Sequence, residues 1–323
     1  MEAGPRGEVV PAPFDRVVIV GAGLMGRGIA QACAGHGCEV VITDQSAACA
    51  EAAATEIDRG LAFLAERGLA PPAPARVTCR VGLDALPERV PVVVEAITED
   101  LEAKRRLFAA LEERFPRPTI FTSNTSSLRV TDMASGLHDP SRLIGMHFIM
   151  PAQVVPVVEI VRGEVTSDET LAVARAFSAA IGKRPIVVNR DIPGFVLNRL
   201  QHALHREAYH LMTLGVTTAE EIDLGVKLAL APRFLSTGLL EQKDLSGMEV
   251  HYAVAQGLYP DLCTDSVPRG VLPALIAEGR LGVRTGRGFF DWTRVDVPRH
   301  VERRLALHVD ALRLAAAAGA GAR

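Results

Sequence analysis

The sequence predicts two domains, an α/β domain built around a parallel sheet and, after it, a mainly α-helical domain. As far as residue 191, short runs of β-branched residues alternate with Ala- and Leu-rich stretches, which is the pattern of β-α-β units. After Asp191-Ile192-Pro193-Gly194 the strand-like runs stop, and helical stretches separated by Gly and Pro follow. The length of 323 residues also suits two domains, since a domain has roughly 150 residues.

The elements of the first domain follow from the same alternation. Strands are predicted over residues 16–20, 39–43, 76–81, 91–97, 119–122, 143–148, 154–161 and 185–188. Helices are predicted over residues 25–34, 47–67, 101–115 and 168–181, and a further helix over 195–214. We therefore place the α/β domain at residues 14–191 and the helical domain at residues 192–323. Residues 1–13 are expected to form a loose tail, and their sequence resembles neither a secretory signal nor a transit peptide. Residues 70–74 are expected to form a loop, because they contain several prolines.

Composition excludes several classes of function. The chain carries 35 basic and 38 acidic residues, a net charge of −3, so no broad basic field is available for nucleic acid. Its apolar runs end well before the ~18 residues that a membrane span requires. The five cysteines form no C-x-x-C pair, and no His, Cys or acidic cluster has metal-ligand spacing. We therefore expect a cytoplasmic protein without a metal, a membrane segment or a nucleic-acid partner.

A glycine loop joins the first predicted strand to the first predicted helix. In Gly21-Ala22-Gly23-Leu24-Met25-Gly26, Gly21 allows a tight turn, Gly23 lets a pyrophosphate approach the backbone, and Gly26 lets the helix pack on the strand. Asp44 ends the second strand 18 residues after Gly26, where a carboxylate binds the adenosine ribose and repels the 2′-phosphate of NADP. The first domain is therefore predicted to be of the Rossmann type and to bind NAD. Asp44 would equally serve as a helix N-cap, which is compatible with that function.

A histidine and a glutamate lie on consecutive predicted strands. His147 lies near the end of one strand, and Glu159 lies on the next, after a turn that contains proline. A carboxylate on one imidazole nitrogen fixes the tautomer and stabilises the imidazolium that forms when the other nitrogen takes a proton. Such a pair suits removal of an alcohol proton while hydride leaves for nicotinamide. The alternatives are a buried structural histidine and a surface carboxylate on an edge strand.

Four further segments follow the glycine loop in a recognisable order. They are Val94-Glu95-Ala96-Ile97-Thr98-Glu99, Asn124-Thr125-Ser126-Ser127-Leu128, Gly145-Met146-His147-Phe148 and Pro193-Gly194-Phe195-Val196-Leu197-Asn198-Arg199. Over residues 17–292 the chain resembles the 3-hydroxyacyl-CoA dehydrogenase family. Residues 238–247 and 258–262 are also similar to the lambda-crystallin and L-gulonate 3-dehydrogenase branch, whose members oxidise hydroxy acids without CoA.

The resemblance implies roles for individual residues. His147 would be the general base, Glu159 would orient it, and Ser126 and Asn198 would hydrogen-bond the substrate oxygen. Glu99, Lys104 and Ser126 would contact the ribose and nicotinamide end of NAD. The predicted cofactor site comprises Gly21, Gly23, Leu24, Met25, Gly26, Asp44, Gln45, Ala96, Ile97, Glu99, Lys104, Asn124, Ser126 and Arg284. The helical domain would form the interface of a homodimer.

Two departures from the family pattern leave the substrate open. Met150 stands where the family has an asparagine near the reacting carbonyl. Gly60 and Arg67 stand where acyl-CoA enzymes have Ser and Lys for the CoA moiety, so Arg59 and Arg67 are the evident phosphate partners. The expected substrate is a 3-hydroxy group on either an acyl thioester or a hydroxy acid. The alternative is a crystallin-like protein that binds NAD with little or no catalysis. The related 3-hydroxyisobutyrate type is disfavoured, because its catalytic Lys after a Gly-Gly pair is missing.

Overall fold

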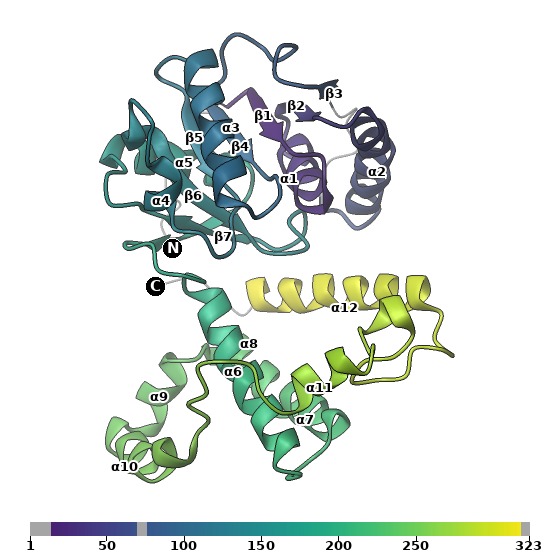
Figure 1. Ribbon diagram of the computed structural model, residues 1–323. Helices are drawn as coiled ribbons and strands as arrows, with labels where there is room; N and C mark the ends of the chain where they lie inside the picture. The colour runs from purple at the N-terminus through teal and green to yellow at the C-terminus, as the bar shows by residue number, and fades with distance from the viewer. Residues whose placement is uncertain (1–13, 70–75, 318–323) are drawn as a thin grey trace, which may run out of the picture. The chain divides into compact units, whose positions relative to one another are not determined.

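The structure is a computed structural model that describes residues 14–69 and 76–317. It divides into two compact units between Asn198 and Arg199 (Figure 1). The predicted tail at 1–13 and the predicted loop at 70–74 lie outside the described residues. Each unit is described separately below.

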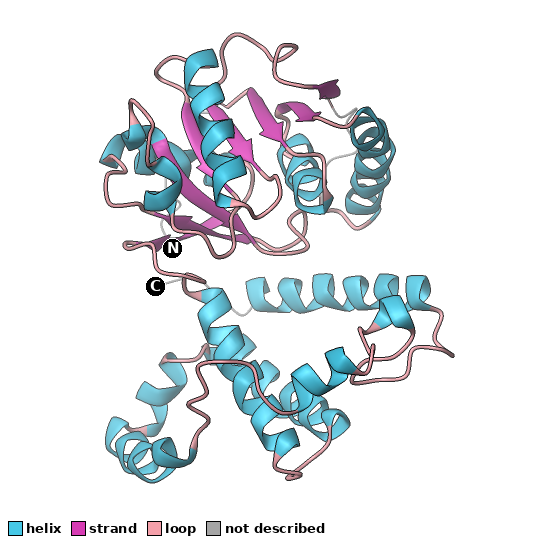
Figure 2. Cartoon of the chain, in the orientation of Figure 1, coloured by secondary structure: helices cyan, strands magenta, loops and turns pink. Residues whose placement is uncertain are grey.

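The first unit contains one sheet of eight strands with the order β3-β2-β1-β4-β5-β6-β7-β8 (Figure 2). The strands are β1 (Arg16–Val20), β2 (Glu39–Asp44), β3 (Val77–Val81), β4 (Val92–Glu95), β5 (Ile120–Ser123), β6 (Leu143–Phe148), β7 (Val157–Val161) and β8 (Arg184–Val188). The strand order reverses between β1 and β4, which pair in parallel. In an open α/β sheet, ligands bind at the carboxyl ends of the strands at such a reversal. The predicted α/β fold is confirmed.

One strand pair corrects the prediction of a parallel sheet. β6 and β7 are antiparallel, and their register places His147 opposite Glu159. The two strands are joined by residues 149–156, whereas a parallel connection needs a crossover of about a dozen residues or more. The predicted strand over 154–161 also begins later, at Val157. Val154 and Val155 instead donate their N–H groups to the Pro151 carbonyl in a turn.

Helices cover both faces of this sheet. The helices are α1 (Leu24–Gly35), α2 (Ala47–Glu66), α3 (Leu101–Arg114), α4 (Val130–Ala134) and α5 (Asp168–Ala180). α1, α2 and α5 pack on one face and α3 and α4 on the other. Side chains alternate along β1 accordingly, because Val17 and Ile19 join one core and Val18 and Val20 the other. The sequence did not predict α4, whose five residues are too few for a helical period to appear.

The second unit is helical, as predicted. Its helices are α6 (Leu197–Thr213), which begins in the first unit, α7 (Ala219–Gly225), α8 (Ala231–Thr237), α9 (Glu241–Ser246), α10 (Met248–Leu258), α11 (Val271–Ala277) and α12 (Val297–Ala317). The domain boundary predicted between residues 191 and 192 falls in the loop before α6 and stays a prediction. Over residues 14–69 and 76–317, no helix combines the length and apolar character needed to cross a membrane.

Candidate active site

The glycine loop follows β1 and is fastened by Asp44. One carboxylate oxygen of Asp44 accepts the N–H of Ala22 at 2.9 Å, and the other accepts the N–H of Ser46 at 2.9 Å. Asp44 therefore joins the loop to the start of α2. Each of its oxygens keeps a lone pair that could accept a ribose hydroxyl.

The three glycines fit a dinucleotide in different ways. A Cβ on Gly21 would overlap the carbonyl of Ala96, and a Cβ on Gly26 would overlap the carbonyl of Gly21. A Cβ on Gly23 would meet nothing within 4 Å. Gly23 is the N-cap residue of α1, and no side chain caps the start of this helix. The open backbone and the N–H groups at this helix end suit a pyrophosphate, so the loop fits NAD.

The other predicted residues around this loop differ in exposure. Leu24 is exposed, Met25 packs against the core, and Gln45 is exposed beside Asp44. Ala96 and Ile97 follow β4 and are half-buried. The Ala96 N–H donates to the Val20 carbonyl, which holds the end of β4 against the end of β1.

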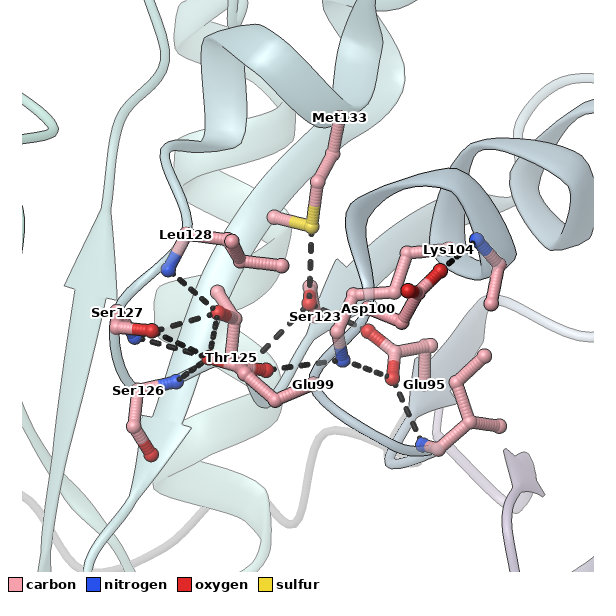
Figure 3. A network of polar contacts seen from close by, with 12 residues as sticks. Glu95, Glu99, Asp100, Lys104, Ser123, Thr125, Ser126, Ser127, Leu128 and Met133 are labelled. Atoms are coloured by element: carbon pink, nitrogen blue, oxygen red, sulfur yellow. Dashed lines mark hydrogen bonds and ion pairs between the residues drawn. The ribbon is translucent and has the colours of Figure 1, made fainter.

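A charged network lies behind the ends of β4 and β5 (Figure 3). Glu95 is fully buried, and its two oxygens lie 2.5 Å from Lys104 Nζ and from Ser123 Oγ. Lys104 is 1% exposed and also lies 3.4 Å from a Glu99 oxygen. Burial raises the pKa of Glu95, against the opposing effect of the Lys104 ammonium. Glu95 and Ser123 are not among the site residues predicted from the sequence, although a glutamate that ends the apolar run Val92–Val94 is itself a signal of a special site.

Glu99 organises the segment after β5. Its Oε1 accepts the Thr125 hydroxyl at 2.6 Å and the N–H groups of Ser126 and Ser127 at 3.0 Å. Burial acts to raise the pKa of Glu99, but the Thr125 hydrogen bond, the Lys104 charge and the two N–H groups together lower it. Glu99 is therefore an anion that fixes the backbone on either side of the Ser126 side chain.

Asn124, Ser126 and Asn198 lie on two adjoining segments. The Asn124 Oδ1 accepts the N–H of Phe148, so its Nδ2 group is the donor available to a ligand. Asn198 Nδ2 donates to the Ser126 carbonyl oxygen at 3.2 Å. The structure thus brings together the two residues that the resemblance assigns to the substrate oxygen.

His147 and Glu159 form a buried pair. His147 Nδ1 donates to Glu159 Oε2 at 2.7 Å, because an ionised carboxylate can only accept. Glu159 Oε1 accepts the N–H groups of Val196 and Leu197 at 2.9 and 3.0 Å. Although burial opposes ionisation, these hydrogen bonds lower the pKa of Glu159. An anionic Glu159 leaves His147 Nε2 as the nitrogen that can take a proton.

Phe195 is a neighbour of this pair to which the sequence assigned no role. It is 1% exposed, and its ring lies edge-on to the His147 ring with 5.7 Å between centroids. Its φ is +48°, a left-handed conformation that is rare for an aromatic residue and concentrates at functional sites. No sequence pattern predicts that angle.

The remaining predicted residues are Met150, the arginines Arg59 and Arg67, and Arg284. Met150 is 61% exposed on the loop between β6 and β7. Arg59 on α2 lies 3.0 Å from Glu56 in an exposed ion pair, and the guanidinium of Arg67, the residue that follows α2, lies over the Phe63 ring. Arg284 belongs to a short turn of the second unit, and its contact with the cofactor stays a prediction.

Two family models match adjoining parts of the chain. The model described as 3-hydroxyacyl-CoA dehydrogenase, NAD binding domain, matches residues 16–192. The model described as 3-hydroxyacyl-CoA dehydrogenase, C-terminal domain, matches residues 194–292.

Individual relatives differ in the substrate that their names state. A probable 3-hydroxybutyryl-CoA dehydrogenase from Bacillus subtilis is 35% identical over 86% of this chain and 98% of that protein. A 5-formyl-3-hydroxy-2-methylpyridine 4-carboxylate 5-dehydrogenase from Mesorhizobium japonicum is 31% identical over 86% of this chain and 90% of that protein.

The titles of similar solved structures also state different substrates. The crystal structure of a 5-formyl-3-hydroxy-2-methylpyridine 4-carboxylic acid 5-dehydrogenase matches with a TM-score of 0.84 and 28% identity, covering 94% of this chain and 97% of that one. A (S)-3-hydroxybutyryl-CoA dehydrogenase from Ralstonia eutropha matches with a TM-score of 0.71 and 34% identity, covering 87% of this chain and all of that one.

Proposed function

Since the chain belongs to the 3-hydroxyacyl-CoA dehydrogenase family, we propose that His147 takes the proton of a substrate 3-hydroxyl group as hydride leaves the same carbon for NAD. The protein is an NAD-dependent oxidoreductase that acts on a CH–OH group. The hydrogen bond of 2.7 Å between His147 Nδ1 and Glu159 Oε2 is the observation that carries the residue assignment.

NAD supplies the hydride acceptor when bound, and the chain's own residues supply proton transfer and positioning. Glu159 keeps His147 Nδ1 protonated and offsets the positive charge that appears on the ring when Nε2 takes the proton. Ser126 and Asn198 hydrogen-bond the substrate oxygen while its bond to carbon becomes a carbonyl. In the reverse direction the same imidazolium returns the proton.

The substrate that carries the 3-hydroxyl group is either a CoA thioester or a free hydroxy acid. Arg59 on α2 and Arg67 just after it are the evident phosphate partners, and both contact side chains of that helix, Glu56 and Phe63. Met150, whose thioether is exposed, offers no hydrogen-bond donor at the position where the family has an asparagine near the reacting carbonyl. These two features favour a hydroxy acid over a CoA thioester as the better substrate.

A substrate panel tests this function. NADH formation would be followed by absorbance with 3-hydroxyacyl-CoA esters and with free hydroxy acids, for the wild type and for Met150→Asn. The proposal expects turnover of hydroxy acids by the wild type, and a gain with acyl-CoA esters in the variant. No turnover of either class would contradict it. The relatives named above are all described as dehydrogenases, so the non-catalytic alternative gains no support from them.

We further propose a cytoplasmic homodimer joined through the helical unit. Helices α7 to α10 of that unit contain no buried residue. Exposed apolar side chains on these helices include Leu224, Leu245, Met248, Val250, Tyr252 and Val254, and Leu240, just before α9, is exposed as well. A second copy would cover such a surface, which a soluble monomer rarely exposes. The five cysteines are all free thiols, which suits a reducing compartment.

A further inference from the structure

Lys183 is a buried cation whose ammonium bonds to backbone carbonyls. It lies between α5 and β8, is 5% exposed, and its Nζ donates to the carbonyl oxygens of Ala152 and Val155, both at 2.7 Å. Burial lowers the pKa of Lys183 to about 8, and no carboxylate of the described residues contributes to that pKa. The cost of burying this ammonium is therefore offset by two carbonyl oxygens rather than by an opposite charge.

Both carbonyls belong to the loop of residues 149–156, which joins β6 to β7. Within this loop the N–H groups of Val154 and Val155 donate to the Pro151 carbonyl at 3.0 Å and close a turn. The turn thus satisfies these two N–H groups itself, whereas two of its carbonyls depend on a side chain from outside the loop. Lys183 therefore fastens the loop to the start of β8.

The same loop lies beside the proposed active site. It follows Phe148, whose N–H donates to Oδ1 of the predicted cofactor residue Asn124 at 2.9 Å. A Cβ placed on Gly28 of α1 would lie 3.2 Å from the Ala152 Cβ, so the loop packs closely on the helix that follows the glycine loop. Met150, an exposed residue of the loop, stands where the resemblance implies a contact with the reacting carbonyl.

We propose that Lys183 is a positioning residue for the substrate, because its ammonium holds loop 149–156, and with it the side chain at position 150, in a fixed position relative to His147. The inference rests on the proposed function and adds a residue that determines how the substrate is held. The competing explanation is that Lys183 only stabilises the fold.

Arg142 offers a matched control for Lys183. It is also buried, at 4% exposed, and its Nη1 donates to the backbone carbonyls of Phe115 and Thr119 at 2.9 and 3.2 Å. It directly precedes β6, at the opposite end of that strand from His147. Lys183→Met and Arg142→Met therefore remove the same kind of contact, one near the site and one away from it.

Steady-state kinetics on the best hydroxy substrate separates the two explanations. Lys183→Met is expected to raise the substrate KM by about tenfold, because a small misplacement of a binding group is costly, while NAD affinity by calorimetry stays within about twofold. Arg142→Met should lose stability and keep the substrate KM within about twofold. A substrate KM that is unchanged in Lys183→Met, or that rises equally in both variants, would overturn the proposal.

Amide hydrogen exchange tests the loop without any substrate. In the free protein the amides of Val154 and Val155 should exchange faster in Lys183→Met and at the wild-type rate in Arg142→Met. Equal exchange in the wild type and Lys183→Met would contradict the proposal. If the wild type turned over no hydroxy substrate, the proposed function would fail, and these exchange rates would still decide whether Lys183 holds the loop.

Lys183→Gln provides a second variant in case Lys183→Met does not fold. Its amide group can still donate to a carbonyl, but the side chain is one bond shorter than that of lysine. A raised substrate KM together with faster exchange at Val154 and Val155 supports positioning. Wild-type values of both in Lys183→Gln contradict it.

Discussion

Glu159 serves two neighbours with its two oxygens, His147 through Oε2 and the start of α6 through Oε1. In Glu159→Gln the amide oxygen can keep the two N–H groups of α6, but the amide NH2 donates to His147 Nδ1, so the imidazole carries its proton on Nε2 and cannot act as the base. We expect the free energy of unfolding to fall by roughly 1–3 kcal/mol, and kcat to fall by about 10²–10⁴-fold. Glu164→Gln, which changes an exposed carboxylate just after β7, is the control. A variant with normal kcat would show that Glu159 does not orient the base.

The same carboxylate gives the protein an acid-sensitive part of its stability. Because the pKa of Glu159 is lower in the folded protein than its ordinary value of about 4.3, its contribution is complete above that pH. That contribution is lost as the pH falls through the lower, folded pKa. Denaturant titrations of the wild type below pH ~4 should therefore show a loss of stability that is smaller in Glu159→Gln. Equal losses in both proteins would contradict this assignment.

Phe195 presses edge-on against the His147 ring from a strained backbone. Phe195→Leu should remove that contact and lower kcat while leaving NAD affinity unchanged. Phe177→Leu is the control, because Phe177 is equally buried but belongs to α5 and packs in the core on the other side chains of that cluster. Both variants should lose similar stability, so a kcat loss of the same size in both would assign Phe195 a purely structural role.

Two glycines at the start of α1 are expected to respond differently to substitution by alanine. Gly23→Ala places a methyl group in open space, so stability should stay within about 0.5 kcal/mol of the wild type while NAD binding weakens. Gly26→Ala would drive a Cβ into the Gly21 carbonyl and should destabilise the fold itself. Thermal unfolding and calorimetric NAD titration check both variants. Unchanged NAD affinity in Gly23→Ala would contradict the placement of the pyrophosphate.

The sequence predicts the elements of the first unit well where a single periodicity of apolar residues dominates. The apolar runs at β1 and β6 match the structure at both ends. The antiparallel pairing of β6 with β7 could have been expected from the short connection between them, although hydrophobicity alone does not carry direction. The burial of Lys104 and the positive φ angle of Phe195 could not be predicted from the sequence, because both depend on residues distant in sequence.

In a single chain, many large apolar side chains of the helical unit are exposed to solvent. Its exposed apolar side chains predict that the protein has no stable monomer at working concentrations. Light scattering after size-exclusion chromatography should give about twice the chain mass of 34.5 kDa at micromolar concentration. A monomer at all concentrations would contradict the proposed interface.

The role proposed for His147, as the base that takes the hydroxyl proton, is tested by substitution. Turnover and NAD affinity of His147→Asn would be compared with those of the wild type, on the best substrate of the panel. We expect kcat to fall by about 10²–10⁴-fold, since the base is removed. NAD affinity should remain within about twofold, because no cofactor contact is lost. Turnover within about tenfold of the wild type would contradict the claim.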